Sequence, residues 1–86
     1  MKLKYEFVTN EVAGKTVAVA VGDSLEAFGG YIKLNETGAF IFSLLKNEIS
    51  REEIVNAVRG EYEVEKERAE EKVDEFLAYL ASFGVI

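Results

Sequence analysis

The hydroxyl groups that could act as nucleophiles belong mainly to four serines, at positions 24, 43, 50 and 82. None of them lies in a Gly-x-Ser-x-Gly turn, and the chain contains neither histidine nor cysteine. The usual nucleophile and base pairs, imidazole or thiolate metal ligands and a proton shuttle near neutral pH are therefore missing. We expect no catalysis, no metal and no cofactor.

Carboxylates are concentrated between residues 61 and 71, but without the Asp-x-Asp-x-Asp-Gly spacing of a calcium loop. A solvated face, with favourable negative charge near a helix start, accounts for them. Gly29-Gly30 is followed by no Gly-Lys-Ser/Thr sequence, so we expect a turn there rather than a phosphate-binding loop.

The chain has 86 residues, which suits one compact domain over 1–86, and 49% of them are hydrophobic. Its apolar runs are much shorter than the roughly 20 residues of a membrane span, and no signal-peptide pattern begins it. We therefore expect a cytoplasmic protein that does not enter a membrane. The net charge of −6 disfavours nucleic acid as a partner.

Short runs rich in strand-forming residues fill the first third of the chain. They predict strands over Tyr5 to Thr9, Lys15 to Val21 and Tyr31 to Leu34, with a turn at Gly14 and a loop before the third strand. In the second strand, every other residue is a valine. The alternate alanines leave the opposite face thin enough to admit a closely packed element.

Two capping signals then predict helices. Asn35 can cap a helix running from Glu36 to about Lys46. Ser50 and Glu53 have the spacing of a capping box at the start of a second helix, which weakens near Gly60. Both helices carry apolar residues that must cover the sheet.

A third helix is predicted from about Glu65 to Phe83, with Gly84 at its stop. The order β-β-β-α-α-α describes an α+β domain resembling a winged helix-turn-helix, with a three-stranded antiparallel sheet followed by three helices. A winged-helix DNA-binding regulator is one alternative function. Acidic residues at the start of the last helix oppose it, because they would be desolvated against phosphate.

The third strand offers another kind of site. If Tyr31 to Leu34 lies at a sheet edge, its free N–H and C=O groups need water or a partner strand, and no proline blunts the edge. Lys33 could act as a gatekeeper. A strand from another chain could add here, or the edge could pair with itself in a structural, self-associating module.

The segment from Tyr31 to Ile41 resembles the strand-to-helix signature of the PqqD-like family, in which a strand leads to Leu-Asn-x-x-Gly. The resemblance extends over nearly the whole chain. It includes Leu44-Leu45, Ser50-x-x-Glu53, Glu61-Tyr62 with Val64, and the final Phe83-Gly84-Val85-Ile86.

This resemblance implies a winged-helix-like element that recognises ribosomally made precursor peptides. The leader segment of the precursor would add as a fourth strand to the third strand, in a cleft against the third helix. The module would then present the precursor to a peptide-modifying enzyme, often a radical SAM protein, and would have no catalysis or cofactor of its own. A monomer or a weak homodimer is expected.

The resemblance also implies candidate binding residues. Arg68 and Lys72 would meet leader carboxylates, although Lys72 could instead pair with Glu75 or Asp74. Leu34, Asn35 and Gly38 would be scaffold, and Phe76 could equally be an ordinary core residue. The peptide-binding set implied by the resemblance is Tyr31, Ile32, Lys33, Arg68, Lys72, Phe76 and Tyr79.

Overall fold

The computed structural model describes residues 1–86. Its strands β1 (Phe7–Val12), β2 (Lys15–Ala20) and β3 (Tyr31–Leu34) form an antiparallel sheet in the order β1-β2-β3. β1 and β2 are joined by Ala13 and Gly14, whose φ angles are 53° and 80°. Positive φ at both positions is characteristic of a two-residue type I′ hairpin turn. The predicted turn at Gly14 is confirmed.

The strand bounds differ from the prediction mainly in β1, which was expected over Tyr5 to Thr9. The tight turn sets a register in which Val12 faces Lys15, so pairing extends β1 to the turn. The two residues between Thr9 and Val12 are Asn10 and Glu11, which are rare in strands, so the sequence did not predict this extension. The predicted third strand is confirmed at its stated bounds.

A short helix, α1 (Ser24–Ala27), lies between β2 and β3, where the sequence predicts only a loop. The element order is therefore β-β-α-β-α-α-α rather than β-β-β-α-α-α. Four residues are too few to show a helical period in the sequence, and the side chain of Asp23 makes no capping hydrogen bond. The hydroxyl of Ser24 accepts a hydrogen bond from the Glu6 N–H at 3.0 Å, which fixes α1 beside the start of β1.

Three longer helices follow the sheet: α2 (Glu36–Leu44), α3 (Arg51–Tyr62) and α4 (Lys66–Ser82). The predicted ends of α2 and α4 lie within one or two residues of these bounds, which is the usual fraying of helix ends. α3 continues through Gly60 to Tyr62. None of the helices combines the length and the apolar character that a membrane span needs.

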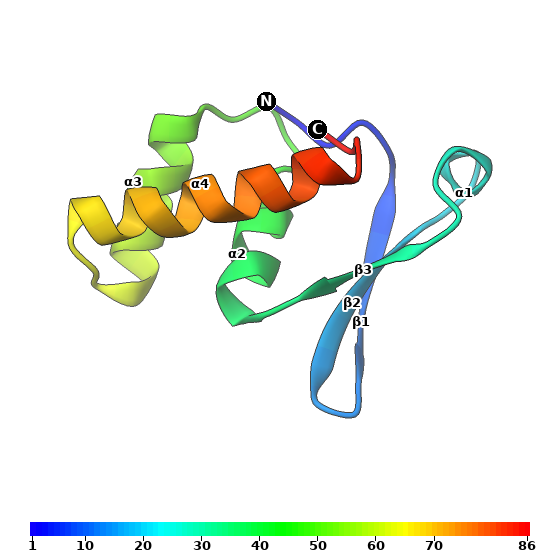
Figure 1. Cartoon of the computed structure of the whole chain (residues 1–86), viewed down its shortest axis with the longest axis horizontal. Coiled ribbons are helices and arrows are strands. Elements are labelled where there is room, and N and C mark those ends of the chain that lie inside the picture. The colour runs from blue at the N-terminus through cyan, green and yellow to red at the C-terminus, as the bar shows by residue number, and fades with distance from the viewer.

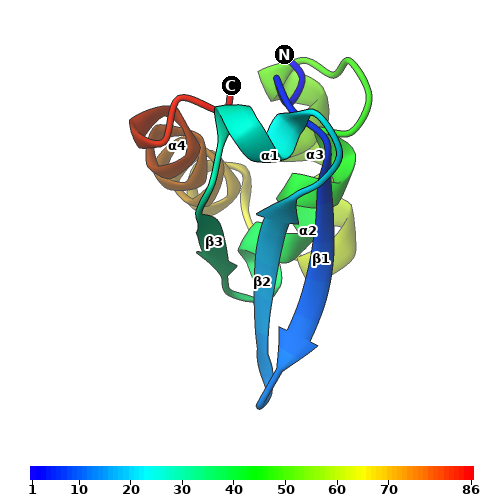
Figure 2. The same cartoon turned by 90° about the vertical axis from the view of Figure 1, so that its right-hand side faces the viewer.

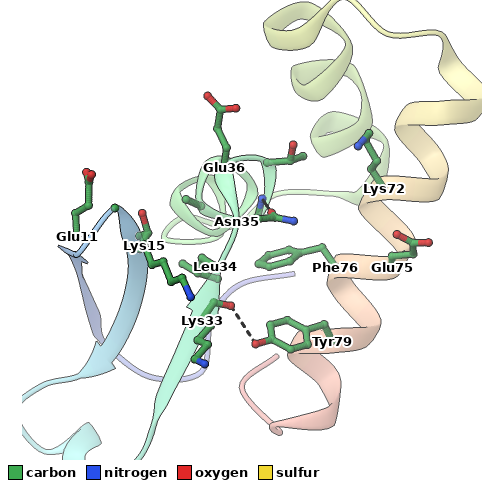
Figure 3. A pocket seen from close by; sticks show the side chains of 15 residues that line it. Glu11, Lys15, Lys33, Leu34, Asn35, Glu36, Lys72, Glu75, Phe76 and Tyr79 are labelled. Atoms are coloured by element: carbon green, nitrogen blue, oxygen red, sulfur yellow. Dashed lines mark hydrogen bonds between the residues drawn. The ribbon is translucent and has the colours of Figure 1, made fainter.

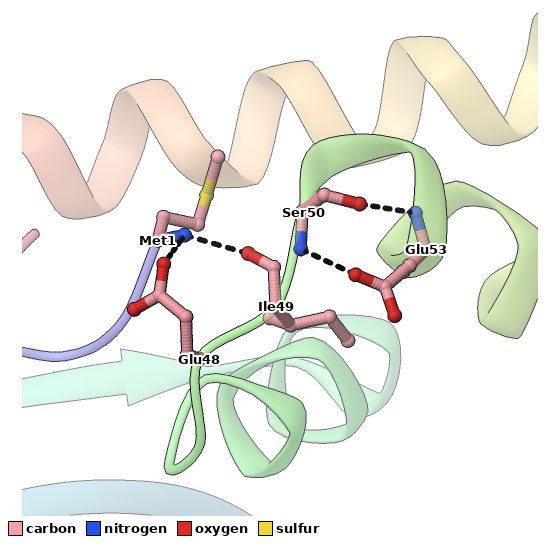
Figure 4. Close-up of polar contacts among 5 residues, drawn as sticks. All are labelled: Met1, Glu48, Ile49, Ser50 and Glu53. Atoms are coloured by element: carbon pink, nitrogen blue, oxygen red, sulfur yellow. Dashed lines mark hydrogen bonds and ion pairs between the residues drawn. The ribbon is translucent and has the colours of Figure 1, made fainter.

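Local signals fix where the helices begin and end. Ser50 and Glu53 form the predicted capping box, in which each side chain accepts from the other residue's N–H, at 3.1 Å and 3.0 Å (Figure 4). The amino group of Met1 donates to the Glu48 carboxylate at 2.7 Å beside it. At the end of α4, Gly84 has φ +72° and the Val85 N–H lies 3.5 Å from the Leu80 carbonyl, which is a Schellman motif, so the predicted stop at Gly84 is confirmed.

Helices α2, α3 and α4 gather on one side of the sheet, and the tip of the β1–β2 hairpin projects beyond them (Figures 1 and 2). The sheet residues that enter the core on the covered face are Phe7, Ala18, Ala20, Ile32 and Leu34. The small alanines therefore face the helices, as the thin face of the second strand predicts. The valines of β2 lie on the opposite face, which no helix covers.

Candidate functional site

β3 is an edge strand, because it pairs with β2 on one side and with no strand on the other. The hydroxyl of Tyr79 on α4 donates to the Lys33 carbonyl at 3.0 Å, so this carbonyl faces the free side. In an antiparallel sheet the N–H and C=O of one residue point the same way, and the direction alternates along the strand. Tyr31 and Lys33 therefore present their main-chain groups to the free side, while Ile32 and Leu34 pair with β2.

The free side of β3 opens into a groove of about 930 Å³ between β3, the start of α2 and α4 (Figure 3). The end of the β1–β2 hairpin closes one side of it. In Figure 2, α4 lies on the side of β3 that faces away from β2. The fifteen lining residues are Glu11, Gly14, Lys15, Thr16, Lys33 to Ala39, Lys72, Glu75, Phe76 and Tyr79.

The inner wall of the groove depends on the close approach of α4 to the start of α2. Asn35 caps α2 by accepting from the Gly38 N–H at 2.7 Å. A Cβ atom at Gly38 would lie only 2.8 Å from Cε1 of Phe76 and 2.9 Å from Oδ1 of Asn35. Gly38 therefore lets the Phe76 ring rest on the helix start, which agrees with the scaffold role expected for Asn35 and Gly38.

Two aromatic side chains of α4, Phe76 and Tyr79, line the groove, and Phe83 packs against Tyr79 behind them. Phe76 is 9% exposed, so it is both a core residue and part of the wall. The Tyr79 ring lies 6.1 Å from the Phe76 ring and 5.1 Å from the Phe83 ring, the latter in an edge-to-face arrangement. An apolar side chain entering the groove would meet this aromatic row.

Charged side chains of both signs surround the opening. The three lysines are Lys15, Lys33 and Lys72, and the three glutamates are Glu11, Glu36 and Glu75. Lys72 makes no ion pair, so neither Glu75 nor Asp74 neutralises it. The groove can therefore offer a carboxylate an ammonium group that is not engaged in an ion pair.

The structure brings four of the seven predicted site residues into the groove: Lys33, Lys72, Phe76 and Tyr79. The side chains of the other three lie elsewhere, although the main-chain groups of Tyr31 face the free side of β3. The side chain of Ile32 is 0% exposed in the core, and that of Tyr31 is 56% exposed on the uncovered face of the sheet. Arg68 lies outside the lining, with a guanidinium nitrogen 3.4 Å from the Glu71 carboxylate.

Sequence reasoning missed the contribution of the hairpin, chiefly Glu11, Lys15 and Thr16. The register places Thr16 opposite Leu34, directly beside the groove. The sequence predicted only a turn at Gly14, with the first strand ending at Thr9. The two-residue turn, and the register that it sets across the sheet, were therefore not predicted.

Shifted pKa values occur outside the groove. Hydrogen bonds from Arg51, at 2.7 Å and 2.8 Å, hold the pKa of Asp74 below its usual range and tie α3 to α4. Hydrogen bonds from Ser50 lower the pKa of Glu53, and burial raises the pKa of Tyr62. No three side chains of the metal-ligating types gather at one place. The groove is suited to binding by hydrogen bonds, apolar contact and charge.

Comparison with known proteins identifies relatives. A solved structure described as TbiB1 in complex with the TbiA(beta) leader peptide matches with a TM-score of 0.75 and 30% identity, covering 99% of this chain and 93% of that chain. No curated protein matches. The profile of the family described as coenzyme PQQ synthesis protein D (PqqD) matches residues 15–86, which include β2, β3 and all the helices. The chain therefore belongs to the PqqD family.

Proposed function

We propose that this protein binds the leader segment of a ribosomally made precursor peptide by adding it as a fourth strand to β3. The observation that carries the proposal is the unpaired side of β3, which faces a groove of about 930 Å³. A free strand edge supplies main-chain affinity, and a groove beside it supplies side-chain selectivity. The similar TbiB1 structure, described as a complex with a leader peptide, supports this choice of ligand.

The main-chain groups of Tyr31 and Lys33 would hold the guest strand. β3 has four residues, so it can pair with a guest segment of similar length, about 13 Å long. Side chains of the guest alternate between the two faces of the extended sheet. Those on the covered face would enter the groove, and those on the other face would lie beside the exposed ring of Tyr31.

The side chains of the groove suit a guest with an apolar anchor and a carboxylate. Phe76 and Tyr79 offer aromatic surface, and Lys72 offers positive charge. The Lys33 side chain shares the exposed face of β3 with Tyr31, so its ammonium group would meet guest side chains on that face. Arg68 would act only on a guest that extends past the lining toward the start of α4. The side chain of Ile32 is buried in the core, where it supports β3, so it would not contact the guest.

The binding module would present the precursor to a separate peptide-modifying enzyme, such as a radical SAM protein, and would be non-catalytic itself. The absence of histidine and cysteine supports a purely binding role. We infer a cytoplasmic site of action, since ribosomally made precursors are produced there. The protein would act as a monomer or a weak homodimer.

A binding experiment tests the proposal. The probe is a labelled synthetic peptide covering the first half of a short open reading frame adjacent to this gene, and a scrambled peptide is the control. We expect a micromolar or lower Kd, measured by fluorescence anisotropy and calorimetry. No binding by any such neighbouring peptide at saturating concentration would contradict the proposal.

A pair of variants at one position tests the binding mode. Lys33→Pro removes an N–H from the free side of β3 and leaves the ladder to β2 intact, whereas Lys33→Ala removes the same side chain and keeps the N–H. Losing this main-chain bond leaves a guest carbonyl unpaired, so Lys33→Pro should bind roughly tenfold or more weakly than Lys33→Ala. Equal affinity of the two folded variants would show that the guest does not pair with β3.

A further inference from the structure

Tyr79 occupies the position at which a guest strand must bind. Its side chain reaches from α4 across the groove, and its hydroxyl donates to the Lys33 carbonyl at 3.0 Å (Figure 3). This carbonyl is one of the few outward acceptors of β3. In the free protein it is already bonded to a side chain of the same molecule.

The aromatic neighbours of Tyr79 favour this bridging position. Phe83 lies edge-to-face against the ring at 5.1 Å, and Phe76 lies on its other side at 6.1 Å. The side chain is nevertheless 38% exposed, so water can solvate the hydroxyl once it leaves the carbonyl. The contact is therefore preorganised but open to release.

We propose that Tyr79 is a latch on the edge of β3, which an incoming strand must open. The proposal rests on the proposed function. A guest strand pairs at about 4.8 Å from β3 and directs an N–H at the same carbonyl. A carbonyl oxygen can accept two hydrogen bonds, but α4 flanks the side on which the guest would lie. The guest N–H thus replaces the tyrosine O–H, and the ring moves out of the strand's path.

The latch gives the groove a selectivity that its lining alone would not. Binding breaks the hydrogen bond from Tyr79 to the Lys33 carbonyl, and only a guest residue with an N–H opposite Lys33 can replace it. Proline has no N–H, so it is excluded at that position of the guest. The same contact leaves the free edge less open to a second copy of the chain, because the outward acceptor of Lys33 is already used.

The test compares wild type with Tyr79→Phe, which keeps the ring and removes only the hydroxyl. Tyr62→Phe is the matched control. The Tyr62 hydroxyl also approaches a main-chain carbonyl, that of Glu36 at 3.4 Å, but this carbonyl belongs to α2 and not to β3. The probe is the labelled peptide that binds wild type. We expect Tyr79→Phe to bind about 2- to 10-fold more tightly, because it has no hydrogen bond to give up.

The other outcomes separate the latch from the proposed function. Equal or weaker binding by Tyr79→Phe, with the control unchanged, would overturn the latch and leave strand addition intact. Failure of every neighbouring peptide to bind both wild type and Tyr79→Phe would overturn the proposed function and the latch with it. A gain in affinity by Tyr62→Phe equal to that of Tyr79→Phe would also overturn the latch, since the effect would not depend on the strand edge.

Discussion

Replacing Gly38 with alanine should destabilise the fold, against the usual preference of helices for alanine. A Cβ at this position would lie 2.8 Å from Phe76 and 2.9 Å from the capping oxygen of Asn35, and both distances are shorter than real Cβ contacts. Gly-to-Ala substitution within a helix is worth up to about 1 kcal/mol in favour of alanine. Overpacking costs about 1 to 3 kcal/mol, and disturbing the cap costs about 1 kcal/mol more. We expect a net loss of about 1 to 3 kcal/mol.

Urea and thermal unfolding followed by circular dichroism measure this loss. In a domain of this size it corresponds to a decrease in Tm of about 4 to 24 °C. Gly60→Ala is the matched control, because Gly60 lies within α3 and a Cβ there would meet nothing within 4 Å. The control should gain up to about 1 kcal/mol. Equal stabilisation of both variants would show that Phe76 and Asn35 move aside freely and that Gly38 is not needed for close approach.

Two further predictions concern the helices behind the groove. Ser50→Ala should lower the free energy of unfolding by about 1 kcal/mol in urea titrations, because it removes the acceptor that caps α3, and an unchanged midpoint would contradict the capping-box role. The pKa of Asp74 is lowered in the folded state, so its ion pair with Arg51 stabilises the fold above about pH 4 and is lost as the pH falls further. Asp74→Asn should therefore show a smaller fall in Tm between pH 7 and pH 3 than wild type; parallel curves would refute the assignment.

Features with local signals could be predicted from the sequence. The capping box at Ser50, the cap at Asn35 and the stop at Gly84 each depend on residues within five positions of one another, and all three are present. The bounds of β3 were also predicted correctly, because glycines precede it and a helix cap follows it. The short helix α1 carries no such signal, since its turn is held by a contact with the distant N–H of Glu6.

The groove could be predicted only in part, because its lining residues come from separate elements that are brought together only by the tertiary fold. Lys72, Phe76 and Tyr79 share one face of α4 at helical spacing, and this face was identified. Arg68 lies one helical turn before Lys72, yet the lining ends at Lys72 because α4 extends past the end of β3 (Figure 1). The hydrogen bond from Tyr79 to Lys33 joins residues 46 positions apart and has no sequence pattern.

Amide hydrogen exchange at β3 tests most directly whether a peptide adds to this edge. In the free protein the N–H groups of Ile32 and Leu34, which face β2, should exchange slowly, while those of Tyr31 and Lys33 exchange fast. Saturation with the peptide should slow exchange at Tyr31 and Lys33 and leave the other two unchanged. Unaltered exchange at these two residues, or new protection along β1 instead, would contradict strand addition to β3.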